Sequence, residues 1–158
     1  MMLEKVISGG QTGVDQMALL VARKYGFQTG GTAPKGYRTE TGPNFLLRDL
    51  YGLKESESYN YRNRTIDNIR ESDATVWFGV TTSAGGILTL NTARHECDRR
   101  RYYCSINPSI EDFRQLLLAP IRILNVAGNR LQTHPEASVL AAEILEAVLW
   151  RRGQAEDV

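Results

Sequence analysis

"SGGQTGVDQMALL", residues 8–20, decides the fold of this chain. A short apolar run at 3–8 leads into it, and an apolar helical pattern at 14–25 begins inside it and ends at Gly26. A strand that passes through a glycine-rich turn into a buried helix is the first half of a βαβ unit. Glycines there also let backbone N–H groups converge at a helix N-terminus, where anions bind favourably. The stretch predicts a parallel α/β fold, with either a tight structural turn or an anion site at this point.

The rest of the chain continues the alternation of strands and helices. The predicted strands are 27–31, which is weak, 74–80, 102–106 and 121–127, and the predicted helices are 61–72, 87–100, 109–118 and 136–150. Strands of about six residues that alternate with helices of ten or more form a parallel sheet with right-handed crossovers. A long polar loop, 30–44, interrupts the pattern, and loops of that length in a small domain are usually functional or disordered.

Composition indicates one soluble domain. The 158 residues are 42% apolar and 23% charged with a formal net charge of +1, which is too balanced for a nucleic-acid or membrane-surface protein. We expect a single domain over 1–150 and a polar tail over 151–158. The chain has no apolar run of membrane-spanning length and no signal-peptide pattern, so we expect a cytoplasmic protein. Cys97 and Cys104 fit no metal-binding spacing and are predicted to be buried, reduced thiols.

Two glycine-rich loops are the strongest functional motifs. The first follows the strand at 3–8, and the second, "VTTSAGGILT" at 80–89, follows the strand at 74–80. Ligands of open parallel sheets bind at the carboxyl ends of the strands, so both loops face one crevice if these strands are neighbours. The predicted phosphate contacts are Gly9, Gly10, Gln11, Thr12, Gly13, Thr82, Ser83, Gly85, Gly86 and Thr89. Neither loop fits the Walker A or G-x-G-x-x-G motif, and plain strand–helix turns are the alternative.

Basic residues outside these loops are candidate contacts for the same phosphate. Lys35 and Arg38, with Gly36 between them, lie in the polar segment 30–44 and are able to close over an anion. Arg62 begins a polar stripe on its predicted helix, which is either a binding wall or solvated surface. A solvated loop with incidental charges is likewise the alternative for the polar segment.

Asp15 is the acidic residue nearest to the first glycine loop. A carboxylate in the first turn of a helix interacts favourably with the helix dipole, which explains Asp15 without any function. The functional alternative is a partner such as a ribose hydroxyl, a metal or a water molecule, because the carboxylate repels phosphate. The histidines and cysteines form no metal or nucleophile motif, so no metal site is predicted.

Five segments in order, "GGQTGVDQMAL", "GGTAPKGYRTETGP", "YNYRNRTIDNIRESDATVWF", "AGGILT" and "LNVAGNR", resemble the circularly permuted YpsA-like branch of the SLOG superfamily. Members of this branch are often named molybdenum carriers, and the wider superfamily includes lysine-decarboxylase-like LOG proteins and molybdenum-cofactor carriers. The resemblance implies a Rossmann-like three-layer α/β/α sandwich with a mainly parallel sheet. It also implies a nucleotide-like phosphorylated ligand and a homodimer or higher homo-oligomer.

Two departures from the relatives bear on catalysis. LOG proteins cleave the ribosyl bond of cytokinin nucleotides with a Gly-Gly-x-Gly-Thr loop closely followed by glutamate, whereas here no acid follows Gly85 and Gly86 until Glu96. The Pro-Arg-Glu-Ser sequence that relatives carry after "NVAG" is replaced by "NRLQTHP", in which Arg130 keeps a basic residue. The resemblance therefore leaves open whether the chain is an enzyme.

Three functional hypotheses follow. The favoured one is a protein that binds a nucleotide or a phosphorylated pterin, with molybdopterin carrying any molybdenum because no thiolate or carboxylate cluster is present to ligate the metal. The second is a nucleoside-monophosphate N-glycosidase in which Asp15 or Glu96 assists departure of the base. The third is an oligomeric interaction module with a vestigial pocket.

Overall fold

A parallel five-stranded sheet forms the centre of the fold in the computed structural model, which describes residues 1–150; the polar tail predicted at 151–158 lies outside the described residues. The strand order is β2-β1-β9-β7-β8, and all four neighbouring pairs are parallel. The strands are β1 Lys5–Ile7, β2 Gln28–Gly30, β7 Ala74–Phe78, β8 Tyr103–Ile106 and β9 Ile123–Gly128. This arrangement confirms the predicted parallel α/β class.

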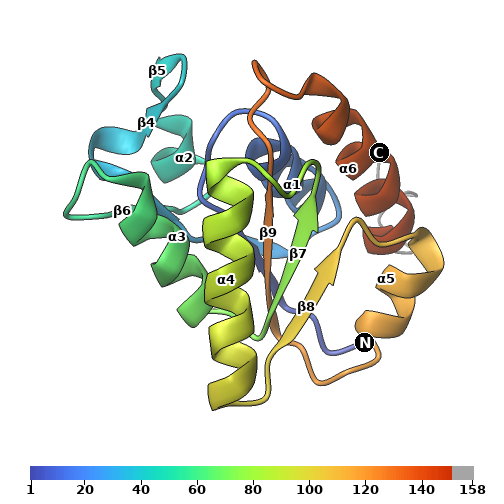
Figure 1. The fold of residues 1–158 in the computed structure, drawn as a ribbon. Helices are drawn as coiled ribbons and strands as arrows, with labels where there is room; N and C mark the ends of the chain where they lie inside the picture. The colour runs from blue at the N-terminus through green and yellow to red at the C-terminus, as the bar shows by residue number, and fades with distance from the viewer. Residues whose placement is uncertain (151–158) are drawn as a thin grey trace.

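Helices cover both faces of the sheet, which gives the predicted three layers (Figure 1). Two helices, α3 and α4, pack on one face, and three helices, α1, α5 and α6, pack on the other. The long helices are α1 Val14–Lys24, α3 Tyr61–Arg70, α4 Ala84–Arg99, α5 Ile110–Leu116 and α6 Pro135–Leu149. These layers leave the carboxyl ends of the strands open between α3, α4 and the loops that follow the strands.

The polar segment predicted as one long loop at 30–44 contains short regular elements instead. Two small sheets are formed here. In the first, β3 Thr32–Ala33 pairs with β6 Lys54–Glu55, which lies further along the chain, and in the second, β4 Arg38–Thr39 pairs with β5 Gly42–Pro43. A 3-10 turn, η1 Lys35–Tyr37, completes the segment, and a one-turn helix, α2 Leu46–Asp49, follows it. Leu47 and Leu53 anchor it by packing against Leu19 of α1 in a small buried cluster.

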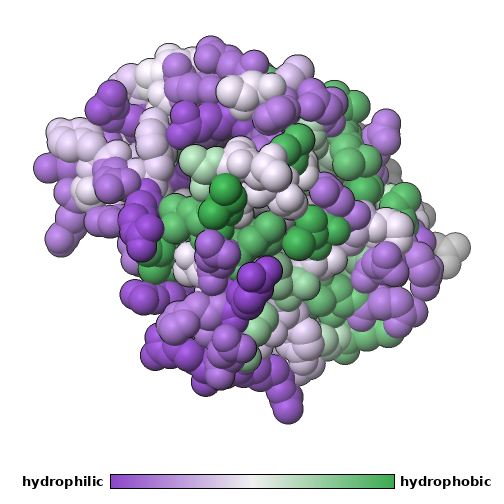
Figure 2. All heavy atoms as spheres, in the orientation of Figure 1, coloured by the Kyte–Doolittle hydropathy of each residue, from purple (hydrophilic) through white to green (hydrophobic). Residues whose placement is uncertain are grey.

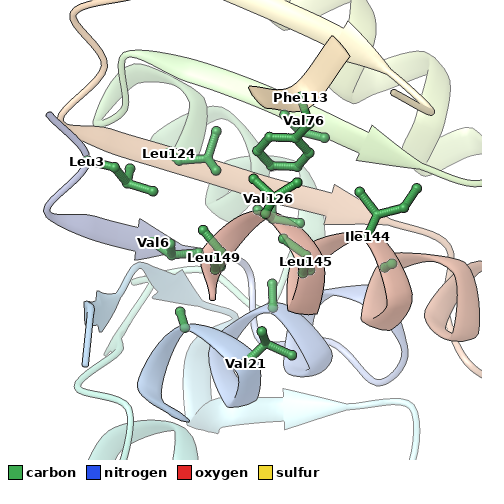
Figure 3. Packing of buried hydrophobic residues seen from close by; sticks show 14 of the residues in the cluster. Leu3, Val6, Val21, Val76, Phe113, Leu124, Val126, Ile144, Leu145 and Leu149 are labelled. Carbon is green, nitrogen blue, oxygen red and sulfur yellow. The ribbon is translucent and has the colours of Figure 1, made fainter. Parts of the chain in front are cut away.

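The main hydrophobic core lies between the sheet and the layer of α1, α5 and α6. Figure 3 shows Val126 of β9, Leu145 of α6 and Phe113 of α5 packed together in this core. Val76 belongs to the same core, whereas its neighbours Thr75 and Trp77 are buried outside it. Because successive side chains of a strand point to opposite faces, Thr75 and Trp77 face α3 and α4. Trp77 therefore points to the side of the sheet that carries the candidate site.

Capping residues fix two helix starts. Ser109 caps α5, as predicted, by accepting a hydrogen bond from the Asp112 N–H at 3.1 Å. Ser83 caps α4 in the same way through the Gly86 N–H at 3.1 Å, so α4 begins at Ala84, three residues before the predicted start at 87. The earlier start places both glycines of the second loop inside the first turn of a helix.

The two cysteines do not have the predicted burial. Cys97 and Cys104 are both free and exposed. Cys104 is on β8, which lies at one edge of the sheet. No helix within residues 1–150 is both long and apolar enough to cross a membrane.

Candidate functional site

Three loops at the carboxyl ends of neighbouring strands enclose a cavity of about 230 Å³. The two glycine-rich loops follow β1 and β7, which are not neighbours because β9 lies between them, and yet both loops line this cavity. The loop after β9 therefore fills the space between the glycine loops. It contributes Asn129, Arg130 and Thr133 to the cavity wall. Helix α3 adds Arg64 and Thr65 to the wall, and the strands β7 and β9 add Trp77, Ala127 and Gly128.

A buried ion pair forms one side of the cavity. Arg64 Nη1 lies 3.3 Å from Asp15 Oδ2, and the exposed fractions of the two side chains are 13% and 4%. Burial raises the pKa of the Asp15 carboxyl, and the Arg64 charge and a hydrogen bond from the Gln11 N–H oppose that shift. Burial likewise lowers the pKa of the Arg64 guanidinium, with Asp15 opposing it. For both residues of the pair, the effect of burial on the pKa is therefore larger than the opposing effect of the partner's charge.

Gly9 is the residue that makes room for Arg64. A Cβ atom on Gly9 would lie 1.7 Å from Arg64 Nη1 and 2.5 Å from Arg64 Cζ. The neighbouring glycines have different roles, since Gly10 packs against Leu47 and Gly13, at φ +90°, packs against the Asn129 carbonyl. The glycines of the first loop therefore admit parts of the protein itself to close approach.

Gln11 is held in one orientation by its carbonyl oxygen. Gln11 Oε1 accepts hydrogen bonds from the N–H groups of Thr12 at 3.3 Å and Glu40 at 2.7 Å. Glu40 is fixed in turn, because its carboxylate accepts hydrogen bonds from the Thr12 hydroxyl and, at 3.1 Å, from the Gln132 N–H. The Nε2 end of the Gln11 amide is buried and has no hydrogen-bond partner among the described residues.

Three residues that line the cavity have a buried N–H donor without a hydrogen-bond partner among residues 1–150. Within the described part of the chain, Gln11 Nε2, Arg64 Nε and Trp77 Nε1 all lack a hydrogen-bond partner, and all three residues line the cavity. A buried polar group without a partner costs about 1–3 kcal/mol, so an acceptor that reached these groups would recover part of that free energy. The acceptor that fits a set of N–H donors is an oxygen-rich anion.

The second glycine loop adds the N-terminus of α4 to the cavity. Ser83 and Gly85 line the cavity, and a Cβ on Gly85 would meet no atom within 4 Å. A Cβ on Gly86, by contrast, would lie 2.8 Å from the Thr81 carbonyl oxygen. Asn129 joins this loop to the β9 loop by hydrogen bonds to the Val80 N–H at 2.6 Å and to Ser83 Oγ at 3.3 Å. Gly85 thus leaves open space at a helix N-terminus, where an anion is favoured.

The cavity brings together only part of the predicted set. The predicted residues that line it are Gln11, Asp15, Ser83, Gly85 and Thr89. The predicted residues outside its lining are Gly9, Gly10, Thr12, Gly13, Lys35, Gly36, Arg38, Arg62, Thr82, Gly86 and Glu96. Lys35 and Arg38 lie over the ring of Tyr59, at 5.2 and 5.6 Å from its centroid. Their closing over a ligand stays a prediction.

Glu96 lies outside this cavity, in a groove between α3 and α4. Its Oε2 accepts a hydrogen bond from Arg100 Nε at 2.9 Å, and this bond is the main reason why the pKa of Glu96 is lowered. Arg100 also donates to the carbonyl oxygens of Ile69, Arg70 and Ser72. The Glu96–Arg100 pair thereby joins the C-terminal ends of α3 and α4.

Sequence reasoning missed Arg64 and Trp77 as site residues. Arg64 lies four positions before Asn68 and three after Tyr61, so helical spacing places it on the side of α3 that faces the first loop. The Tyr61 ring is in contact with Arg64 at 5.7 Å and with Arg130 at 4.6 Å. Trp77 alternates with two core residues on β7, and that alternation was the available signal for a side chain facing away from the core.

Sequence comparison assigns the chain to a family. The sequence model of the Circularly permutated YpsA SLOG family, cpYpsA, matches residues 6–149. The chain belongs to this family. It is also similar to the crystal structure of the "Putative molybdenum carrier protein" from Syntrophus aciditrophicus SB, with 32% identity and a TM-score of 0.79. That match covers 94% of this chain and 96% of the other. Comparison with curated proteins gave no match.

Proposed function

We propose that this member of the cpYpsA family binds a phosphorylated nucleotide-like ligand, either a nucleotide or a phosphorylated pterin, with the phosphate in the cavity. The observation that carries the proposal is that Gln11, Arg64 and Trp77, each with a buried N–H donor that lacks a partner among the described residues, line the same cavity beside the open N-terminus of α4. Charge-assisted N–H bonds and a helix N-terminus are the usual means of holding phosphate. The name of the similar Syntrophus protein, a molybdenum carrier, is compatible with a pterin ligand.

The organic part of the ligand has a neighbouring surface to occupy. Ala84 lines both the cavity and the groove between α3 and α4, so the two lie next to each other at that residue. Near Ala84 the groove is lined by Ile66, Ile87 and Arg62, and Ile87 is 52% exposed. Figure 2 shows apolar residues gathered over this part of α4, whereas the segment around β4–β6 is hydrophilic. A flat heterocycle fits an apolar surface with an arginine beside it.

The same residues fit a molybdenum cofactor only through its phosphate. The described residues contain no group of three or more His, Cys, Asp or Glu side chains placed to hold a metal ion. When bound, a molybdopterin supplies the sulfur ligands of the metal itself. Gln11, Arg64 and Gly85 would bind its phosphate, and the α3–α4 groove near Ala84 would receive the pterin ring.

A second candidate function is hydrolysis of the N-ribosyl bond of a nucleoside monophosphate. The observation in its favour is Asp15, a buried carboxyl in the cavity wall whose raised pKa suits proton transfer. Incubation with a panel of nucleoside monophosphates and chromatography of the released base tests it. Base release that the Asp15→Asn variant lacks would support hydrolysis, and no release across the panel would count against it.

Isothermal titration with AMP, GMP, ribose 5-phosphate and a phosphorylated pterin, beside the matching unphosphorylated compounds, tests the binding proposal. We expect a phosphate-dependent signal that Gly85→Asp weakens at least tenfold, because its carboxylate would lie at the phosphate position. An acid in the first turn is favourable for helix α4, so this variant should fold. Gly85→Ala is the matched control, since its Cβ meets no neighbouring atom within 4 Å. Equal affinity in the Asp and Ala variants would disprove the proposed phosphate position.

A further inference from the structure

The cavity is small for a complete organic ligand. Its volume is about 230 Å³, below the roughly 300–1,000 Å³ of pockets that enclose a drug-sized molecule. At roughly 30 Å³ per water molecule in the liquid, the space is sufficient for a tetrahedral oxyanion together with a few waters. The cavity taken by itself is therefore matched to the anionic end of a ligand and not to a whole nucleotide.

The unpartnered polar groups of the cavity are donors. Gln11, Arg64 and Trp77 all line the cavity and belong to three different elements, the β1–α1 loop, α3 and β7, and each has one N–H donor without a partner among the described residues. Gln11 and Trp77 are 3% and 2% exposed. Donors on several sides suit a compact acceptor with oxygens in several directions, which is the shape of a tetrahedral oxyanion.

The direction of the Gln11 amide is set by the protein and does not depend on a ligand. Both hydrogen bonds from the Thr12 and Glu40 N–H groups reach its oxygen, so the nitrogen end must point the other way. Rotation of the amide would bring its NH₂ group against these two N–H donors. Gln11 is thus prepared to donate before any ligand arrives, which reduces the cost of ordering it on binding.

The charges around the cavity leave a net attraction for an anion. Arg64 and Arg130 line the cavity, and the one carboxylate in the lining belongs to Asp15. Asp15 Oδ2 is already engaged by the Gln11 N–H and by Arg64 Nη1, whereas Arg64 Nε stays without a partner among the described residues. The guanidinium therefore has one N–H for Asp15 and another for a ligand.

We propose that Gln11, Arg64 and Trp77 form a tetrahedral-oxyanion subsite that binds the free inorganic anion, phosphate or molybdate, without an attached organic group. The inference rests on the proposed function, because it assigns the phosphate of that ligand to the same donors, and it goes further by predicting a free oxyanion as ligand. It also gives a chemical form to the molybdenum in the name of the similar Syntrophus protein. An oxyanion needs N–H donors, whereas a molybdenum cation would need ligating side chains.

Fluorescence of Trp77 gives a direct test. Trp77 and Trp150 are the two tryptophans of the chain, and Trp150 is 50% exposed, so the full-length Trp150→Phe protein has Trp77 as its sole indole reporter. We would titrate this protein with sodium molybdate and with inorganic phosphate, using chloride at equal ionic strength as the blank. Competition of each oxyanion against AMP in a calorimeter, on the unmodified chain, provides a second readout that does not depend on fluorescence.

Three variants and one control locate the subsite. Gln11→Glu keeps the oxygen that accepts the two backbone N–H groups but replaces the unpartnered donor with an acceptor, and we expect at least tenfold weaker oxyanion binding. Arg64→Met and Trp77→Phe should weaken it similarly, the latter measured by calorimetry. Arg122→Met removes the same charge at the opposite end of the sheet, from a 63% exposed side chain, and should change affinity less than twofold.

The outcomes separate the inference from the proposed function. Saturable binding of either oxyanion that Gln11→Glu weakens supports the subsite, and the ratio of the two dissociation constants identifies phosphate or molybdate as its ligand. Binding of AMP without any binding or competition by the two oxyanions would overturn the inference and leave the proposed function intact. Oxyanion binding without nucleotide or pterin-phosphate binding would overturn the proposed function and leave the inference intact. Oxyanion binding that is unchanged in Gln11→Glu and in Arg64→Met would overturn the subsite.

Discussion

Arg64 Nη1 lies 3.3 Å from Asp15 Oδ2, and this buried ion pair joins α3 to the first turn of α1 at the wall of the cavity. Burial raises the pKa of Asp15, and the charge of Arg64 is the largest of the influences that oppose the rise. The pair therefore links two properties that can be measured separately, the pH dependence of stability and the affinity for an anion.

Arg64→Met should destabilise the protein in a pH-dependent way. Without Arg64, the folded-state pKa of Asp15 rises further above the ordinary aspartate pKa of 3.8. Between that value and the folded pKa, the folded state holds a proton that the unfolded state has lost, so stability falls as pH rises through this window. This pH window is wider in the variant than in the wild type, because the folded-state pKa of Asp15 is higher in the variant. We expect it to lose about 3 kcal/mol relative to the wild type at pH 8 and much less at pH 4.

Urea unfolding at both pH values measures this difference. Arg122→Met, an exposed position, should cost less than about 0.5 kcal/mol at either pH. Adding Asp15→Asn to Arg64→Met should remove the pH dependence, because the carboxyl that titrates is gone. A destabilisation of Arg64→Met that is equal at pH 4 and pH 8 would contradict the assignment of the effect to Asp15.

Gly9 and Gly13 should respond differently to alanine. In Gly9→Ala the Cβ would meet the end of a flexible side chain, Arg64 Nη1 at 1.7 Å, so we expect Arg64 to move and phosphate affinity to fall at least tenfold in a folded protein. In Gly13→Ala the Cβ would meet the Asn129 carbonyl oxygen at 2.7 Å, at a residue with φ +90°. That clash and the positive φ should cost about 2 kcal/mol or more.

Thermal unfolding and phosphate-ester titration of the two variants, measured side by side, test this contrast. Gly42→Ala is a useful third variant, because Gly42 also has a positive φ of 106° but its Cβ would meet no atom within 4 Å. Its loss of stability isolates the cost of the backbone conformation. Equal affinity of Gly9→Ala and wild type would mean that Arg64 has no part in binding.

The elements that sequence predicted well are those with a local signal. The apolar pattern at 14–25 with its glycine stop corresponds to α1, Val14–Lys24, and Ser109 is the N-cap of α5 as predicted. The paired segments within 30–44 were missed because strands of two residues have no periodicity to recognise. Their position depends on Leu47 and Leu53 packing against α1, which is a tertiary effect.

The site was predictable where it is made of loops and not where it is made of side chains from α3 and β7. Gln11, Asp15 and Gly85 lie in the glycine-rich motifs and line the cavity. The inclusion of Arg64 and Trp77 depends on the strand order, because the position of β9 between β1 and β7 sets how far apart the two glycine-rich loops lie and therefore which residues of α3 and β7 line the cavity. Strand order is set by the packing of the whole sheet, and a single sequence carries no local signal for it.

Glu40→Ala should weaken anion binding although Glu40 does not line the cavity. Its carboxylate holds the Thr12 hydroxyl and the Gln132 N–H, which fixes the backbone whose N–H orients Gln11. Loss of these bonds should let the Gln11 amide rotate and reduce phosphate-ester affinity about three- to tenfold, which corresponds to roughly 0.7–1.4 kcal/mol. Calorimetric titration measures it, with Glu57→Ala, an exposed acid, as control. Unchanged affinity would show that Gln11 keeps its orientation without Glu40.

Glu96→Gln should lower stability without lowering phosphate-ester affinity. Glu96 lies twelve residues beyond Ala84 in α4, which is about 18 Å along a helix with a rise of 1.5 Å per residue. Its carboxylate accepts a hydrogen bond from Arg100, and we expect its neutralisation to cost about 1.5 kcal/mol at pH 7.

The pH dependence of this effect is opposite to that of Arg64→Met. The pKa of Glu96 is lowered, chiefly by Arg100, so its contribution to stability is present above the ordinary glutamate pKa of 4.5 and is lost as pH falls through the folded pKa. The wild type and Glu96→Gln should therefore differ in urea midpoint at pH 7 and converge towards pH 3. Asp98→Asn, on the same turn of α4, is the matched control. Loss of phosphate-ester binding in a folded Glu96→Gln protein would instead connect Glu96 to the ligand, as the form of the N-glycosidase hypothesis that uses Glu96 expects.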